Sequence, residues 1–206
     1  MQNMFIETIQ LPNNAVTIDK GEALRYMGYG KFEPDAAAAA MIDDCLIKAQ
    51  AVCDYKACFA VCPVSVLDDS QTDLSFMQVS SKTFAKHMQG CSQAIVFAAT
   101  VGIGADRLIG KYSRLSPAKA VMTDGIFTAA IESFCDLLCD DIFTGRYGNL
   151  KFRYSPGYGD FPLPAQRTLL QVLNANVKIG VSLTDSLLMT PTKSVSAIVG
   201  IVDKEE

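Results

Sequence analysis

The sequence lacks the features that mark an exported or membrane-spanning protein. Its first residues, MQNMFIETIQLPNN, contain neither the basic start nor the apolar run of a signal peptide. The longest weakly charged stretch, residues 91–105, contains Gly102 and Gly104. It is also shorter than the ~20 apolar residues that a membrane helix needs. We therefore expect a soluble protein of the cytoplasm, with no membrane partner.

An excess of basic residues is also missing. The 18 Lys and Arg residues are outnumbered by 22 Asp and Glu residues, which gives a formal net charge of −4. Because a protein that binds a phosphate backbone needs a basic face, this balance argues against nucleic acid as a partner. Hydrophobic residues make up 50% of the 206 residues, so the chain can bury a sizeable core. The sequence contains no internal repeat and no linker, and we expect one domain over residues 1–206.

The common motifs of catalysis are absent as well. There is no Walker loop, no G-x-S-x-G and no H-E-x-x-H. The stretch ATVGIGAD, residues 99–106, lacks the third glycine and the later acid of a dinucleotide fingerprint. Histidine occurs once, at His87, without a neighbouring cysteine or serine pattern that would indicate a catalytic dyad. A histidine on a helix surface is the ordinary alternative.

Cysteine, in contrast, is abundant, with seven residues. An odd number in a reducing compartment favours free thiols over disulfides. Cys45, Cys53, Cys58 and Cys62 lie close together in the sequence, which is also compatible with a metal or iron–sulfur site. Their spacing matches no zinc or ferredoxin pattern, so we expect buried thiols and no metal ligands. A metal protein built on Cys53, Cys58 and Cys62 stays as an alternative.

Helical and strand-like segments are interspersed without regular alternation. Asp19, followed three residues later by Glu22, predicts a capping box at the start of a helix that Gly28 and Gly30 end. Pro34 and a run of alanines open the clearest helix. We predict an α+β fold, with a mostly antiparallel or mixed sheet and helices against it. The predicted helices span 19–28, 34–53, 80–91, 104–117, 118–148 and 164–175, and the predicted strands lie within 57–66, 74–79, 92–102 and 179–202.

The longest predicted helix, residues 118–148, carries two acids in apolar surroundings. Asp124 and Glu132 are eight residues apart and share nearly one face. An acid there takes a basic partner or a cationic ligand, or it points to solvent, and the sequence leaves all three open. Gly125 is the expected weak point of this helix. Its apolar face is expected to include Val121, Ile131, Phe134 and Leu138.

The most unusual stretch is RYSPGYGDFPLP, residues 153–164, which has too many prolines and glycines for a helix or a central strand. Arg153 offers a planar fork of donors that suits a carboxylate or a phosphate. Gly157, directly after a proline, lets the backbone turn tightly and approach a ligand. Tyr154 and Tyr158 can set aromatic faces or hydroxyls beside it. A ligand-binding loop and a plain connection between helices with a surface salt bridge both fit.

Two linked motifs, RYSPGYGDFPLPAQRTLLQVL from residue 153 and MTPTKSVS from residue 189, resemble the C-terminal activation domain of cobalamin-dependent methionine synthase, above all its free-standing relatives. The resemblance continues more weakly through FAATVGIGADRLI and AIESFCDLL, and it is loose over residues 1–60. It implies an α+β unit with a twisted, mostly antiparallel sheet and flanking helices. It also implies a shallow surface groove that binds S-adenosylmethionine.

The resemblance assigns roles to the loop residue by residue. Arg153, Gly157 and Tyr158 match the family's R-x-x-x-G-Y element. Arg153 would hold the methionyl carboxylate, a pairing that its fork suits. Ser155 would contribute backbone contacts, and Tyr158 would lie toward the cobalt face of the corrin.

Two further residues complete the implied site. Glu132 matches the family's helix acid and would face the cationic part of the ligand, which carries an ammonium and a sulfonium. Asp19 is the candidate for an N-terminal aspartate that the family also uses. No residue of this chain is expected to be catalytic, because the chemistry takes place on the cobalt.

The chain departs from a methionine synthase in having no D-x-H-x-x-G corrinoid signature. It is therefore expected to act in trans as a reactivation subunit, a component of a methyltransferase. It would support reductive remethylation of cob(II)alamin on a separate methionine synthase or another corrinoid methyltransferase. A flavodoxin-type protein is the candidate electron donor. The alternative, from another class, is a non-catalytic docking module that shields a corrinoid protein.

Overall fold

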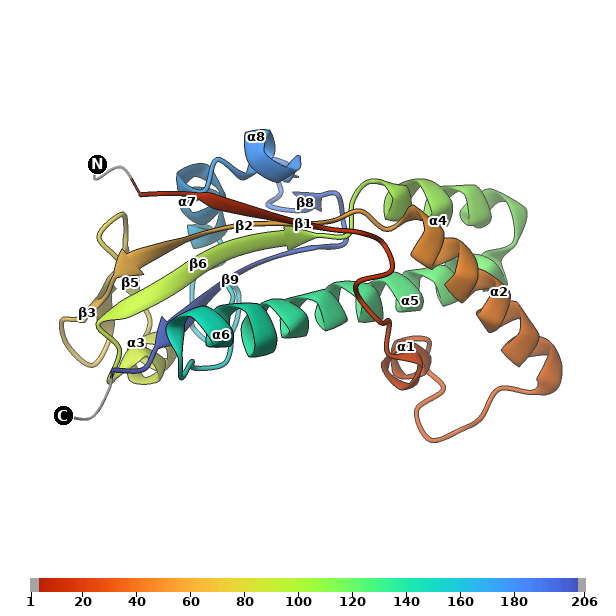
Figure 1. The fold of residues 1–206 in the computed structure, drawn as a ribbon, viewed down its shortest axis with the longest axis horizontal. Coiled ribbons are helices and arrows are strands. Elements are labelled where there is room, and N and C mark those ends of the chain that lie inside the picture. Colours follow the sequence, from red (N-terminus) through yellow and green to blue (C-terminus); the bar gives the residue numbers. More distant parts are fainter. Residues whose placement is uncertain (1–3, 204–206) are drawn as a thin grey trace.

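A four-stranded antiparallel sheet forms the centre of the protein, whose computed structural model describes residues 4–203. The strands lie in the order β1 (Glu7–Leu11), β2 (Tyr55–Pro63), β6 (Gln93–Thr100) and β9 (Ser194–Ile201). Each neighbouring pair is antiparallel, with Phe59 opposite Phe97 and Phe97 opposite Ala197. The predicted α+β fold with a mostly antiparallel sheet is confirmed. Figure 1 shows the long strands crossing the molecule between two layers of helices.

Both faces of this sheet are buried, because its strands are apolar on both sides. Successive residues of a strand point to opposite faces. Phe59 and Phe97 therefore belong to one core, while Cys58 and Val96 belong to a second core on the other face. Near-continuous apolar strands such as QAIVFAAT are the expected consequence of covering both faces with helices.

The first face is covered by α5 (Pro117–Asp136), which starts with a proline at its first position. Its chain continues without a break through a π-helical stretch, Leu137–Phe143, and a last turn, α6 (Thr144–Tyr147). Residues 118–148 are thus helical nearly throughout, as predicted, although the π-helical stretch was not foreseen. Phe134 and Leu138 are buried as expected, whereas Val121 was placed wrongly and is 59% exposed.

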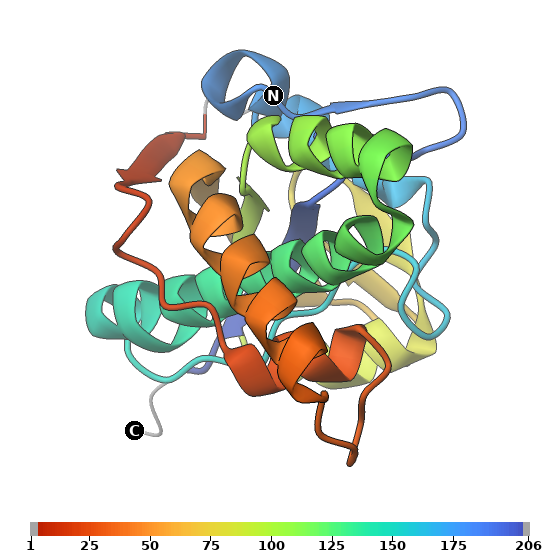
Figure 2. The same ribbon diagram turned by 90° about the vertical axis from the view of Figure 1, so that its right-hand side faces the viewer.

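Three helices gather at the far end of α5, beyond the sheet (Figures 1 and 2): α1 (Lys20–Tyr26), α2 (Ala36–Val52) and α4 (Gly104–Leu115). The side chain of Asp19 caps α1 by accepting from the amide of Glu22. The predicted capping box is only half formed, because the Glu22 carboxylate pairs with Arg25 and not with the backbone of Asp19. Asp35 caps α2 in the same way.

The second face is covered by α3 (Lys82–Met88), α7 (Ala165–Val172) and α8 (Ala175–Ile179). Figure 1 shows α7 and α8 on the opposite side of the sheet from α5. The strand predicted within 74–79 was mostly wrong: this segment is largely a turn, with Ser75 at a φ of +66°. Two small sheets complete the molecule, formed by β3 (Ser65–Val66), β4 (Gln71–Asp73) and β5 (Gln78–Ser80), and by β7 (Ser182–Leu183) and β8 (Met189–Thr190).

Within residues 4–203, none of the helices has both the length and the apolar character that crossing a membrane requires.

Gly125 is a contact point and not the weak point that the sequence suggested. A Cβ atom there would lie 3.2 Å from the amide nitrogen of Met27 and 3.3 Å from the carbonyl oxygen of Ala23. The missing side chain therefore lets the backbone of α1 approach α5 closely. This approach brings Asp19, at the start of α1, beside α5.

We predict that Gly125→Val lowers the free energy of unfolding by about 1–3 kcal/mol, because the new side chain overpacks the contact between α1 and α5. Gly110 in α4 is the matched control, since a Cβ atom there meets nothing within 4 Å. Gly110→Val should change the stability by less than about 0.5 kcal/mol. Urea unfolding followed by circular dichroism measures both variants, and equal stabilities would contradict the prediction.

Candidate functional site

The chain that enters the predicted loop runs along the free edge of β9. The Leu150 and Tyr154 positions bridge to Ile201 and Ile198 of that strand. The amide of Tyr154 donates to the carbonyl of Ile198 at 2.8 Å, and the reverse bond is 2.9 Å long. Because side chains alternate along an extended segment, Arg153 and Tyr154 point to opposite faces of the sheet.

Arg153 reaches toward α5, where two carboxylates share its guanidinium. One arm, Nη1, donates to Asp136 at 2.5 Å, and the other, Nη2, donates to Glu132. Burial alone would lower the pKa of Arg153, but the hydrogen bond to Asp136 and the charge of Glu132 hold this pKa above its ordinary value. Arg153 is therefore a permanent cation with both arms of its fork occupied. The predicted pair Arg153 and Glu132 lies together, and Asp136 is an unpredicted third member.

These acids belong to a polar stripe on α5, which we define as Asp124, Thr128, Glu132 and Asp136. Between Met122 and Asp136 these four residues and Ser133 are the ones that are not buried. Lys193 contacts the first half of the stripe: its Nζ lies 2.8 Å from Asp124 and 2.8 Å from Thr128. Each acid singled out in the sequence has thus taken a basic partner, and each partner comes from one of the two C-terminal motifs.

The loop after Arg153 is compact and closed by its own backbone. The amide of Gly157 donates to Phe161 at 2.8 Å, and the amide of Tyr158 donates to Ser155 at 3.1 Å. Gly157 has a φ of +90°, a conformation that favours glycine. The ring of Tyr158 packs edge-on against Tyr154, with ring centroids 5.4 Å apart, and is 66% exposed. The loop therefore presents an aromatic ring to solvent on a fixed backbone.

Asp160, which the sequence analysis did not single out, fastens this loop to α3. Its carboxylate accepts from the hydroxyls of Ser81 and Thr83 and from the amide of Lys82 at 2.8 Å. These donors, the Ser81 hydroxyl first, hold the pKa of Asp160 well below its usual range. The Tyr154 hydroxyl adds a 2.6 Å bond to Thr83. In the sequence, Asp160 is visible only as a lone aspartate after the second glycine of the loop. This position does not indicate which residues would contact it.

Asp19 lies beside the same part of α5. Its backbone amide is 3.4 Å from the hydroxyl of Ser133, the residue after Glu132. Its carboxylate is engaged in capping α1. The structure thus brings Asp19 next to the helix turn that holds Glu132, with its side chain already in use.

The single histidine is not on an open helix surface. The Nε2 atom of His87 lies 2.9 Å from the carbonyl oxygen of Phe152, and its ring packs against Phe152 and Tyr154. Burial lowers the pKa of His87, although the carbonyl contact opposes this effect. His87 therefore helps to hold the segment that carries Arg153 in place.

The seven cysteines are free and buried. Cys53 belongs to the core on one face of the sheet, whereas Cys58 and Cys62 belong to the core on the other face. The sheet thus separates Cys53 from the other two thiols that the metal hypothesis requires. Among residues 4–203, no three His, Cys, Asp or Glu side chains are grouped in a way that could hold a metal ion.

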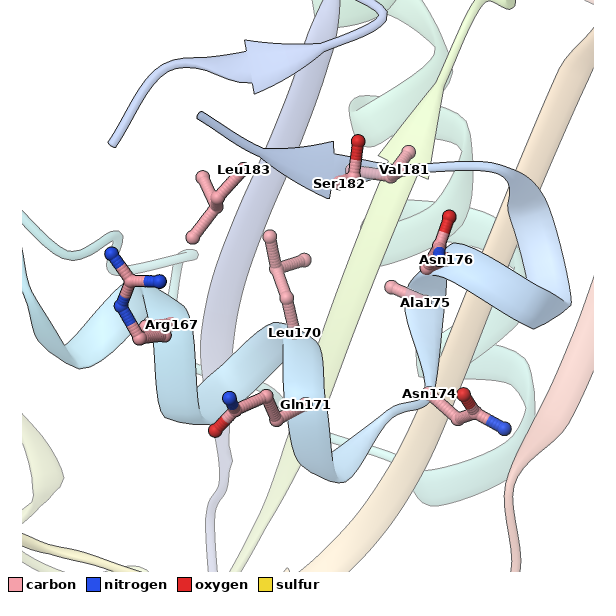
Figure 3. Close-up of a pocket in the computed structure, with 9 residues that line it drawn as sticks. All are labelled: Arg167, Leu170, Gln171, Asn174, Ala175, Asn176, Val181, Ser182 and Leu183. Carbon is pink, nitrogen blue, oxygen red and sulfur yellow. The ribbon is translucent and has the colours of Figure 1, made fainter. Parts of the chain in front are cut away.

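Two surface hollows are relevant to a ligand. The first, of about 510 Å³, opens beside Arg153 and is lined by Asp136, Asp140, Lys151 and Phe152 among others. The second, of about 290 Å³, lies between α7, α8 and β7 (Figure 3). In that view Leu170 points from α7 toward β7, and Arg167 lies at the rim. The second hollow contains none of the predicted site residues.

A planar cation between two carboxylates can recognise a ligand that carries both signs of charge. Arg153 can exchange one of its partners for the carboxylate of a ligand, since guanidinium–carboxylate pairs form by two parallel hydrogen bonds. The other carboxylate can then face the cationic group of the same ligand. The geometry suits the binding and positioning of such a ligand.

Two comparisons with known proteins gave a match. Residues 74–205 match the model of the family described as vitamin B12 dependent methionine synthase, activation domain. A crystal structure of the MetH reactivation domain bound to AdoHcy is similar over 100% of this chain and 81% of that chain, with a TM-score of 0.73 and 13% sequence identity. At this identity the similarity concerns the fold. The search of curated proteins gave no match.

We predict that Asp160→Asn loosens the loop, because an amide cannot accept all the donors that the carboxylate now holds. The unfolding midpoint should fall, and the amides of Gly157 and Phe161 should exchange with deuterium at least about tenfold faster, since local opening governs their exchange. Asp185→Asn, in another exposed turn, is the control. Unchanged exchange at both amides would show that the clamp does not hold the loop.

We also predict a pH dependence that comes from His87. Its pKa is lowered in the folded protein from the ordinary value of 6.5, so the unfolded chain binds more protons as the pH falls. This contribution to stability is complete above pH 6.5 and is lost as the pH falls below that value. The pKa of Asp160 is also lowered, so its contribution to stability is lost only at lower pH. Unfolding midpoints of His87→Gln should therefore fall less steeply than those of the wild type between about pH 7 and 5; parallel curves would exclude His87 as the cause.

Proposed function

This chain belongs to the family of vitamin B12 dependent methionine synthase activation domains, and from that premise we propose that it binds S-adenosylmethionine and presents the methyl group to a corrinoid carried by another protein. The family membership confirms the resemblance that the two C-terminal motifs suggested. The proposal goes further in naming the ligand, its binding residues and action in trans.

One observation carries the proposal: the Arg153 fork lies between two carboxylates at the surface. S-adenosylmethionine has one carboxylate and two cationic groups, so its charges complement this arrangement. Arg153 would bind the methionyl carboxylate by a charge-assisted hydrogen bond. Glu132, whose side chain is 36% exposed, would face the ammonium or the sulfonium.

The loop would complete the site with its backbone. Ser155, Gly157 and Tyr158 follow Arg153 directly, and the turn at Gly157 is fixed by hydrogen bonds. Such a fixed backbone holds a ligand without an ordering cost at the moment of binding. Asp19 would lie at the edge of the site beside Ser133. The protein's contribution is then proximity and orientation of the methyl donor.

The partner would dock over the exposed apolar side chains around the loop. Phe152 is 72% exposed, Tyr158 66% and Leu163 43%, and solvent-exposed aromatic rings of this kind are typical of interfaces. The partner would be a corrinoid-binding methionine synthase or a related methyltransferase. S-adenosylmethionine supplies the methyl group, and an electron would come from a separate donor, for which a flavodoxin-type protein is the candidate. We take residues 1–206 as one unit, because α1 and α2 both pack on α5.

The same exposed rings favour a second candidate function, a docking module that shields a corrinoid protein without binding a nucleotide. The two functions differ in whether docking depends on the methyl donor. Tight binding of the corrinoid partner, with no effect of S-adenosylmethionine and no binding of that ligand alone, would favour the docking module.

We predict that Arg153→Ala weakens the binding of S-adenosylmethionine by at least about tenfold, because a hydrogen-bonded charge pair contributes ~1.5–3 kcal/mol. Isothermal titration calorimetry with S-adenosylmethionine, and with S-adenosylhomocysteine as the comparison, measures the effect. Arg153→Lys keeps the charge without the fork and should fall between the wild type and the alanine variant.

Arg167→Ala is the matched control, since Arg167 is an exposed arginine at the hollow between α7 and α8. Its affinity should equal that of the wild type. Circular dichroism establishes that each variant is folded. If a folded Arg153→Ala protein bound as tightly as the wild type, Arg153 would have no part in holding the ligand.

A further inference from the structure

The two carboxylates that share Arg153 are not equivalent. Glu132 and Asp136 are one helical turn apart on α5, and each takes one arm of the guanidinium. The side chain of Glu132 is 36% exposed, whereas that of Asp136 is 59% exposed. Asp136 is therefore the partner that water already reaches.

The hollow beside Arg153 opens on the side of Asp136. Its lining includes Arg153, Asp136, Asp140 and Lys151, but not Glu132. A carboxylate that arrives from solvent through this hollow meets the arm of Arg153 that Asp136 occupies. The partner of the other arm, Glu132, lies outside this lining.

Releasing Asp136 costs little, because an exposed ion pair contributes ~0.2–1 kcal/mol. Releasing Arg153 from every partner would cost more, since its side chain is only 25% exposed and a desolvated charge needs a counter-ion. The geometry therefore favours an exchange in which one carboxylate replaces another while the Glu132 pair stays intact.

We propose that Asp136 is an internal placeholder for the carboxylate of the ligand: it occupies the Nη1 arm of Arg153 in the free protein, and the ligand displaces it. The inference rests on the proposed function, because the incoming carboxylate is taken to be that of S-adenosylmethionine. Asp136 then acts as a built-in competitor that lowers the affinity for any carboxylate. Glu132 is a positioning residue that keeps the fork extended during the exchange.

The test is Asp136→Asn, titrated calorimetrically with S-adenosylmethionine and with S-adenosylhomocysteine, which lacks the sulfonium charge. Removing the competitor should tighten the binding of both ligands by about two- to fivefold, the range that an exposed pair allows. In the wild type the ligand replaces one ion pair by another, so affinity should depend weakly on salt. In Asp136→Asn a net ion pair forms, and its affinity should fall more steeply with salt.

Asp140→Asn is the matched control. Asp140 lies one turn further along the helix and lines the same hollow, and its side chain makes no ion pair among residues 4–203. This variant removes the same charge without freeing Arg153, so its affinity should not rise. An equal gain in Asp140→Asn would reveal a general effect of charge and would overturn the placeholder.

Unchanged or weaker binding in Asp136→Asn also overturns the inference. If the wild type binds and Arg153→Ala does not, that result leaves the proposed function standing and removes only the placeholder. Binding gained in Asp136→Asn where the wild type shows none supports the placeholder directly. No binding in either protein, at millimolar ligand, overturns both proposals.

Discussion

The position of the candidate site depends on one polar stripe along an otherwise buried helix. Asp124, Thr128, Glu132 and Asp136 repeat every four residues on α5, and the positions between them, apart from Ser133, are buried. Two cations from the C-terminal part of the chain meet this stripe, Lys193 at one end and Arg153 at the other. Eight residues separate Asp124 from Glu132, about 12 Å along the axis at 1.5 Å per residue. The helix thus fixes the distance between the two motifs.

These ion pairs fix geometry more than they stabilise the protein. Partly exposed pairs contribute little free energy, so stability comes from the two apolar cores on either side of the sheet. The edge segment of Arg153 is held from both faces at once, because Tyr154 bonds Thr83 of α3 on the opposite side. A residue that was anchored on one face alone would swing with the loop. The alternation of Arg153 and Tyr154 prevents this and leaves the fork in one orientation.

Much of this arrangement could be predicted from local sequence, and what could not be predicted is long-range. Asp19 marked a helix start correctly, since caps act within a few residues, whereas Pro34 lies just before Asp35, the residue that caps α2. Glu132 stood out because an acid in apolar surroundings needs a partner. The identity of that partner depended on a contact 21 residues away in the sequence. Asp160 accepts a hydrogen bond from Ser81, 79 residues away in the sequence, and no periodic pattern predicts such a contact. The expected burial of Val121 was wrong because the helical period shows which residues share a face of the helix but not which other helices cover that face.

A cation that already has two partners changes how a ligand must be recognised. If Arg153 were unpaired, any carboxylate would gain the full free energy of a new ion pair, and the site would bind many acids. In the proposed site, with Glu132 and Asp136 in place, a ligand carboxylate would gain only the difference between its own pair with Arg153 and the exposed pair that it displaces. Discrimination would then come from the other groups of the ligand, those that face Glu132 or the backbone of the loop. A simple acid has no such groups, whereas a ligand with cationic and aromatic parts does, so under the proposed function the internal pairs would select against the commoner anions.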